Sequence, residues 1–84
     1  MTPFWADGVL INGRARGDQP TMFLWQRREH NVAQVSQHWR VHTLWWTDKE
    51  VWRDYWEVTT DSGFLCVVYH ALIGGEWYLE RVHG

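Results

Sequence analysis

The sequence predicts an all-β protein, a small antiparallel meander of five or six strands curled into a barrel or half-barrel. Two observations favour this fold. Short apolar or alternating segments recur along the chain, and turns that contain Gly separate them. A sheet built from only 84 residues also has to curl to hide its edges. This length corresponds to one domain, residues 1–84.

The N-terminal third predicts two strands joined by a loop. Two Asx-Gly turn signals bracket a short apolar strand at residues 9–11. Residues 14–20 combine Arg, Gly, Asp and Pro, which indicates a loop. The next strand, residues 21–26, places Phe23 and Trp25 on one face by the period of two. We expect Trp25 to be buried in the core.

The following segment is open to two interpretations. A tight turn is predicted at Arg27-Arg28, and the apolar positions after it are Val32, Val35 and Trp39. Steps of three and four fit a helix. They also fit a strand with one β-bulge, because a bulge moves the face by one residue. The Val, His and Asn residues here have little helix propensity, which favours the bulged strand.

The C-terminal half predicts the remaining strands. One of them, residues 64–70, is apolar on both faces and should lie centrally in the sheet. On the last strand, Trp77 and Leu79 should share one face, with Tyr78 and Val82 on the other, and Trp77 should be buried. The predicted elements are an exposed charged connection at residues 47–53, strands at residues 55–60, 64–70 and 77–82, and turns at residues 61–63 and 74–75.

Charge and composition limit the classes of function. The formal net charge of -2 gives no strong bulk attraction to nucleic acid or to an anionic membrane. No apolar run approaches the roughly 20 residues that a membrane span needs, and the N-terminus has no signal-peptide pattern. Cys66 is the single cysteine, so a cytoplasmic location is expected. Residues 1–6 are expected to be a flexible terminus or a small docking flap.

Neither a metal site nor a catalytic site is predicted. His38 and His42 are four residues apart, as are Cys66 and His70, but a structural zinc site would require these two loose pairs to meet. The cysteine lies in the middle of an apolar strand, where a thiol is usually inert. Thr59, Thr60 and Ser62 have no adjacent base, and no glycine-rich phosphate loop precedes a helix. We therefore expect no cofactor and no enzymatic activity.

The Trp residues indicate a binding surface. Five of the 8 Trp lie within residues 39–56. We expect five or six Trp in the core and two or three on the surface, with Trp46 and Trp52 exposed because they flank a charged loop. Such residues are typical of protein–protein hot spots, including contacts between copies of one chain. Trp and Arg together also form stacking platforms for single-stranded nucleic acid, which is the alternative. The candidate binding residues are Trp45, Trp46, Trp52, Arg40 and Arg53.

The spacing of these residues also supports a family resemblance. The chain resembles an uncharacterised family of small Trp-rich bacterial domains that is common in actinobacteria. Members are found near, or attached to, Y-family polymerase-like proteins of the damage-tolerance mutasome. The resemblance implies a setting in DNA-damage tolerance but no particular activity. The residues that carry it are Pro20, Phe23, Trp25, Arg27, Val32, Val35, Trp39, Trp45, Trp46, Arg53, Tyr55, Trp56, Val58, Trp77, Leu79, Arg81 and Val82.

Overall fold

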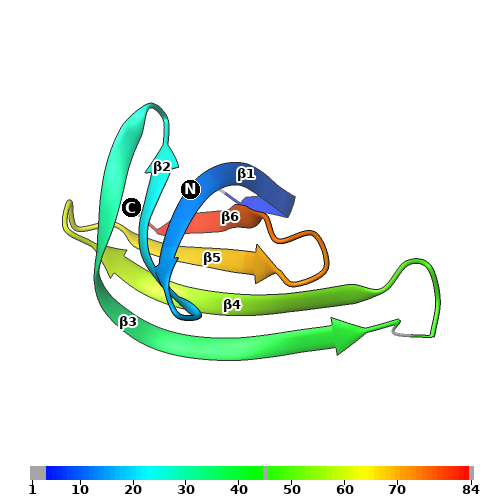
Figure 1. Ribbon diagram of the computed structural model, residues 1–84. Coiled ribbons are helices and arrows are strands. Elements are labelled where there is room, and N and C mark those ends of the chain that lie inside the picture. Colours follow the sequence, from blue (N-terminus) through cyan, green and yellow to red (C-terminus); the bar gives the residue numbers. More distant parts are fainter. Residues whose placement is uncertain (1–3, 45, 84) are drawn as a thin grey trace.

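Six antiparallel strands form a closed barrel in which neighbours along the chain are neighbours in space (Figure 1). The computed structural model describes residues 4–44 and 46–83. No helix that is long and apolar enough to cross a membrane occurs among these residues. The all-β barrel predicted from the sequence is therefore confirmed. The strands are β1 Phe4–Arg16, β2 Gln19–Trp25, β3 Arg28–Thr43, β4 Val51–Thr60, β5 Leu65–Ala71 and β6 Trp77–His83.

Two long strands close the barrel because each of them changes neighbours along its length. β1 pairs with β6 through residues 4–11 and then with β2 through residues 12–16. β3 pairs with β2 through residues 28–31 and then with β4 through residues 32–43. Figure 1 shows both strands bending where the neighbour changes. Among the residues that the structure describes, the second half of β3 consequently pairs with β4 alone.

The prediction of a loop over residues 14–20 is wrong. β1 and β2 continue through this stretch and leave only Gly17 and Asp18 as the turn between them. Gly17 has a φ of 63°, a conformation that glycine adopts without steric cost, so two residues suffice for the turn. Residues 4–6, expected to belong to a flexible terminus or flap, begin β1, whereas residues 1–3 lie outside the described part of the chain.

Both Asx-Gly pairs that were predicted to be turns lie inside β1. The first of them falls where the pairing of β1 with β6 is irregular, between Phe4 and Val9. Gly8 has a φ of 76° there, and a Cβ atom on it would lie 2.9 Å from the ring of Tyr69. Gly8 therefore permits the backbone to approach an aromatic ring closely, and it does not mark a chain reversal.

The ambiguous segment is a strand, as favoured, but it contains two bulges. Ala33 and Ser36 are the extra residues in the pairing of β3 with β4. Each bulge moves the inward face by one residue, so Val32 and Val35 pack against the interior. The second bulge then brings Trp39 to the outer face, and its expected place on the same face as the two valines is wrong.

Other element boundaries also differ from the prediction. The strand predicted at residues 64–70 is β5, which begins one residue later and ends at Ala71. The turn after β2 consists of Gln26 and Arg27, whose φ angles of 52° and 63° are positive, and Arg28 already belongs to β3. The exposed connection predicted at residues 47–53 ends earlier, because β4 begins at Val51. The long β4 extends past the end of β5, and this extension shapes the candidate site below.

The main hydrophobic core fills the barrel interior. Trp77 is buried there, as predicted, whereas Trp25 is only partly buried and packs against the cluster from its edge. Val82 also points inward, in contrast to the prediction, because Glu80 is an extra residue in the pairing of β6 with β5. The cluster consists of Ile11, Phe23, Trp56, Val58, Cys66, Val68, Trp77, Leu79 and Val82.

A second cluster lies on the outer face of the β4–β5–β6 sheet. Its buried members are Tyr55, Val67 and Tyr69, and Val41 and Tyr78 pack against it. β4 and β5 thus carry buried side chains on both faces, which explains why residues 64–70 appear apolar throughout and confirms the central position predicted for them.

Candidate functional site: the projecting β3–β4 arm

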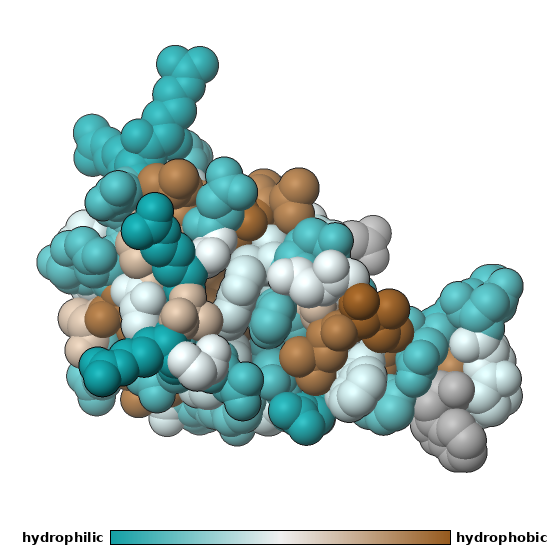
Figure 2. Space-filling model, viewed as in Figure 1, coloured by the Kyte–Doolittle hydropathy of each residue, from teal (hydrophilic) through white to brown (hydrophobic). Residues whose placement is uncertain are grey.

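The hairpin formed by β3 and β4 projects beyond the rest of the sheet (Figure 1). We call residues 42–52 the arm. Pairing of β4 with β5 begins at Arg53, which lies opposite Ala71. Val51 and Trp52 come before this point and pair with β3, so the arm is a two-stranded ribbon. At its base, the backbone N–H of Leu72 donates a hydrogen bond to the carbonyl oxygen of Trp52. Figure 2 shows the arm standing out from the body of the molecule, with apolar surface near its base.

A local hydrogen-bond network shapes the tip of the arm. Leu44 has a φ of 55°, and its carbonyl oxygen accepts bonds of 3.0 Å from both the N–H and the hydroxyl of Thr47. The hydroxyl oxygen of Thr47 in turn accepts a bond from the N–H of Lys49. These contacts turn the chain without burying the side chains of the tip.

Large apolar side chains are exposed on the arm. Trp46 is 67% exposed and Trp52 is 37% exposed, which confirms the exposure predicted for both residues. Leu44 is exposed beside them, and Trp45 lies outside the described residues. Trp39 is exposed as well, so three of the six Trp whose side chains are described are exposed.

Cross-strand stacking stiffens the inner face of the hairpin. The ring of His42 stacks on Trp52 with centroids 4.8 Å apart, and its Nε2 atom also contacts the carboxylate of Glu50. Further toward the barrel, His38 stacks on Trp56 at 3.7 Å with an interplanar angle of 9°. Such pairs stabilise neighbouring strands and hold the arm in one orientation.

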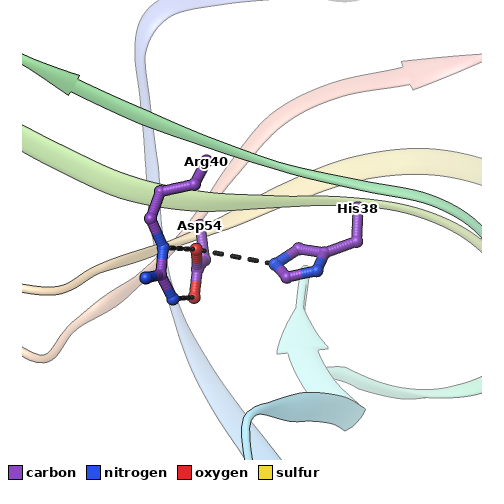
Figure 3. Close-up of polar contacts among 3 residues, drawn as sticks. All are labelled: His38, Arg40 and Asp54. Atoms are coloured by element: carbon purple, nitrogen blue, oxygen red, sulfur yellow. Dashed lines mark hydrogen bonds and ion pairs between the residues drawn. The ribbon is translucent and has the colours of Figure 1, made fainter.

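A buried carboxylate lies between these two stacks (Figure 3). Asp54 is only 2% exposed, and it accepts bonds of 2.6 and 3.1 Å from the Nε and Nη2 atoms of Arg40. His38 Nε2 lies 3.5 Å from the same carboxylate. The hydrogen bonds from Arg40 outweigh burial and lower the pKa of Asp54. The charge of Arg40 is therefore compensated within the hairpin.

A ladder of aromatic rings crosses the outer face of the sheet. Trp39 stacks on Tyr55 with centroids 5.3 Å apart and an interplanar angle of 4°. Tyr55 contacts Tyr69 at 5.1 Å, and Tyr69 stacks on Tyr78 at 4.9 Å. The ladder thus runs from β6 to β3 and ends at Trp39, which the sequence alone placed on the other face.

Arg53 belongs to this outer ladder and not to the inner face. Its guanidinium lies 4.5 Å from the centroid of the Tyr69 ring and donates a 3.2 Å bond to the hydroxyl of Tyr55. Arg40 lies on the opposite face with Asp54. The predicted site residues therefore do not form one continuous stacking platform.

A cleft of about 450 Å³ opens at the base of the arm. Trp52 and Arg53 belong to the predicted set of site residues, whereas the other side chains were missed. Those residues come from strands and turns far apart in the chain, and only the pairing of β4, β5 and β6 brings them together. The cleft is lined by Gly8, Glu50, Val51, Trp52, Arg53, Tyr69, Ala71, Ile73 and Tyr78.

The four residues considered for a metal site have other neighbours. His38 faces Asp54, and the ring of His70 stacks on Trp77 at 4.4 Å. Burial raises the pKa of the Cys66 thiol to about 11, so it is protonated near neutral pH. Among the side chains that the structure describes, no group of three or more His, Cys, Asp or Glu residues could hold a metal ion.

The fold and the arm define a small closed antiparallel barrel with one projecting aromatic hairpin. A family model described as a domain of unknown function (DUF6504) matches residues 9–83, and the chain belongs to this family. Comparisons with curated proteins and with solved structures found no match. Function is therefore argued from the geometry of the arm.

Proposed function

We propose that this protein is a small non-enzymatic binding module that contacts other proteins, including copies of itself, through its β3–β4 arm. The observation that carries the proposal is the exposure of Trp46 at the tip of a hairpin that projects from the barrel, on the same arm as the exposed Trp52 and Leu44. Trp is the residue type most enriched at the energetic centres of protein interfaces. Clustered exposed apolar side chains also mark interaction surfaces.

The charges of the hairpin favour a protein over single-stranded nucleic acid. Arg40 forms a bidentate pair with Asp54, and Arg53 lies over Tyr69. Binding to nucleic acid depends on basic groups that neutralise phosphates. With a net charge of -2 and both candidate arginines engaged in internal contacts, this alternative has less support.

The proposed setting follows from the family resemblance. We place the module in the bacterial cytoplasm, as an accessory of DNA-damage tolerance, where it would connect proteins without a cofactor or a metal ion. The single Cys66 is buried and protonated, which agrees with a role that needs no reactive thiol.

Replacing Trp46 and Trp52 together by Ser is expected to leave the barrel folded and to weaken association. Trp46 and Trp52 are the exposed Trp of the arm among the residues that the structure describes, and removing interface hot spots typically costs about 2 kcal/mol or more each. Sedimentation of the wild-type protein and of the double variant measures the effect, with circular dichroism as the folding check.

Leu10→Ser provides a matched control because Leu10 is 64% exposed but lies on β1, outside the arm. This variant should associate as the wild type does. An unfolded double variant would show that the two Trp support the fold instead. A folded double variant that associates as strongly as the wild type would contradict the assignment of the contact surface to the arm.

A further inference from the structure

The second half of β3 is a free sheet edge. Through residues 32–43 this strand pairs with β4 on one side, and no described residue pairs with its other side. In Figure 1, β3 forms the lower border of the molecule with no strand beyond it. A strand in this position directs backbone N–H and C=O groups outward at every second residue, which is a template for an added strand.

The free edge is regular in its outer part. The bulges at Ala33 and Ser36 interrupt the pairing only in the first part, and residues 37–43 pair with β4 without irregularity. Proteins usually protect such an edge with Pro, a charged side chain, an inward-pointing charge or a bulge. Residues 37–43 contain no Pro, no Lys and no bulge, and Arg40, their formally charged side chain, is paired with Asp54. Every residue among them except Val41 is exposed. The edge is therefore open to another strand.

Charges along this edge are balanced by the molecule itself. Arg40 is paired with Asp54, and His42 contacts Glu50. The edge thus presents no uncompensated positive charge that would select an acidic strand. A second copy of the same edge would meet no strong repulsion.

The aromatic ladder ends at this edge. Trp39 is 37% exposed, and its ring is nearly parallel to that of Tyr55. A strand added beside β3 would place one of its own side chains next to Trp39 on the outer face. Another Trp39 at that position would continue the ladder from one copy into the other.

We propose that two copies of this chain associate by antiparallel pairing of β3 with β3 through residues 37–41, about a two-fold axis between the two Trp39 side chains. The proposal rests on the proposed function and names the partner as a second copy. In this register, Arg40 lies opposite His38 of the other copy. An axis at Arg40 would instead place two guanidinium groups opposite each other, which is unfavourable.

Oppositely charged substitutions at Trp39 test both the partner and the register. Trp39→Lys and Trp39→Glu should each weaken dimerisation by roughly tenfold or more, because the two-fold axis places each new charge opposite its own copy. An equimolar mixture of the two variants should regain the dimer, because Lys then faces Glu. Leu24→Lys is the matched control, since Leu24 is also 37% exposed but lies on β2, and its dimer should match that of the wild type.

Analytical ultracentrifugation measures dimerisation of the wild type, of the two Trp39 variants, of Leu24→Lys and of the mixture. A wild type that is monomeric at every concentration, a Trp39→Lys variant that dimerises normally, or a mixture that stays monomeric would each overturn the proposal. Hydrogen exchange tests the dimer on the wild-type protein alone. Amides within residues 37–41 should exchange more slowly at high than at low protein concentration, and unchanged rates would also overturn the dimer.

A failure of the β3–β3 dimer and a failure of the arm as a contact surface give different results in these experiments. Loss of association in the Trp46→Ser, Trp52→Ser variant combined with a normal Trp39→Lys dimer would retain the arm as a contact surface and reject the β3 edge. The reverse pattern would retain the edge and reject the arm.

Discussion

Replacing Trp77 by Ala is expected to lower the free energy of unfolding by about 3–5 kcal/mol. Trp77 is buried in the barrel interior, and its ring stacks on His70. The backbone at Gly13 approaches so closely that a Cβ atom there would lie 2.6 Å from the indole.

A domain of this size has a total stability of roughly 4–13 kcal/mol, so the variant should be largely unfolded or should melt at a much lower denaturant concentration. Urea titration followed by circular dichroism measures the change. Trp46→Ala is the matched control and should change stability by less than about 0.5 kcal/mol, since Trp46 is 67% exposed. A Trp77→Ala protein with a nearly unchanged midpoint would reject the described core.

The second large effect is expected at Asp54. Changing Asp54 to Asn should lower the free energy of unfolding at pH 7 by about 1.5–3 kcal/mol, because it removes charged hydrogen bonds that a buried side chain makes to Arg40. The neutral amide cannot replace the carboxylate as the acceptor of both donors.

The effect of Asp54→Asn should depend on pH in a defined direction. The pKa of Asp54 in the folded protein lies below its ordinary value of 3.8, so its ionised form stabilises the fold above that value. This contribution is lost as the pH falls through the folded-state pKa. The stability difference between wild type and variant should therefore shrink below about pH 4.

Denaturant titrations between neutral and acidic pH measure this difference, with Asp48→Asn as a control at an exposed position in the turn of the arm. The control should stay within about 0.5 kcal/mol of the wild type at pH 7. A difference for Asp54→Asn that is the same at neutral and acidic pH would show that the carboxylate charge is not what stabilises the hairpin.

The strand pattern could be predicted from the sequence wherever the pairing is regular. On β4, the period of two puts Trp56 and Val58 on one face and Tyr55 on the other, and the structure has them so. It failed after the second bulge of β3 and after the bulge of β6, because one extra residue exchanges the two faces for the rest of the strand. Trp39 and Val82 were misplaced for this reason, and the position of a bulge depends on the partner strand.

The candidate site was predictable only in its local features. The exposure of Trp46 and Trp52 follows from the charged residues between them in the chain. The burial of Asp54 does not, because it depends on Arg40 across the hairpin. The assignment of Arg40 and Arg53 to opposite faces likewise required the register between β3 and β4.

The most direct test of the central claim is sedimentation velocity of the wild-type protein over a wide concentration range, at about 50 and about 200 mM salt. We expect an association that grows with protein concentration and is nearly the same at both salt concentrations, because apolar and aromatic groups make the contact. A protein that remains monomeric throughout and binds oligo-dT with an affinity that falls steeply with salt would contradict a protein-contact module and support the binding of single-stranded nucleic acid.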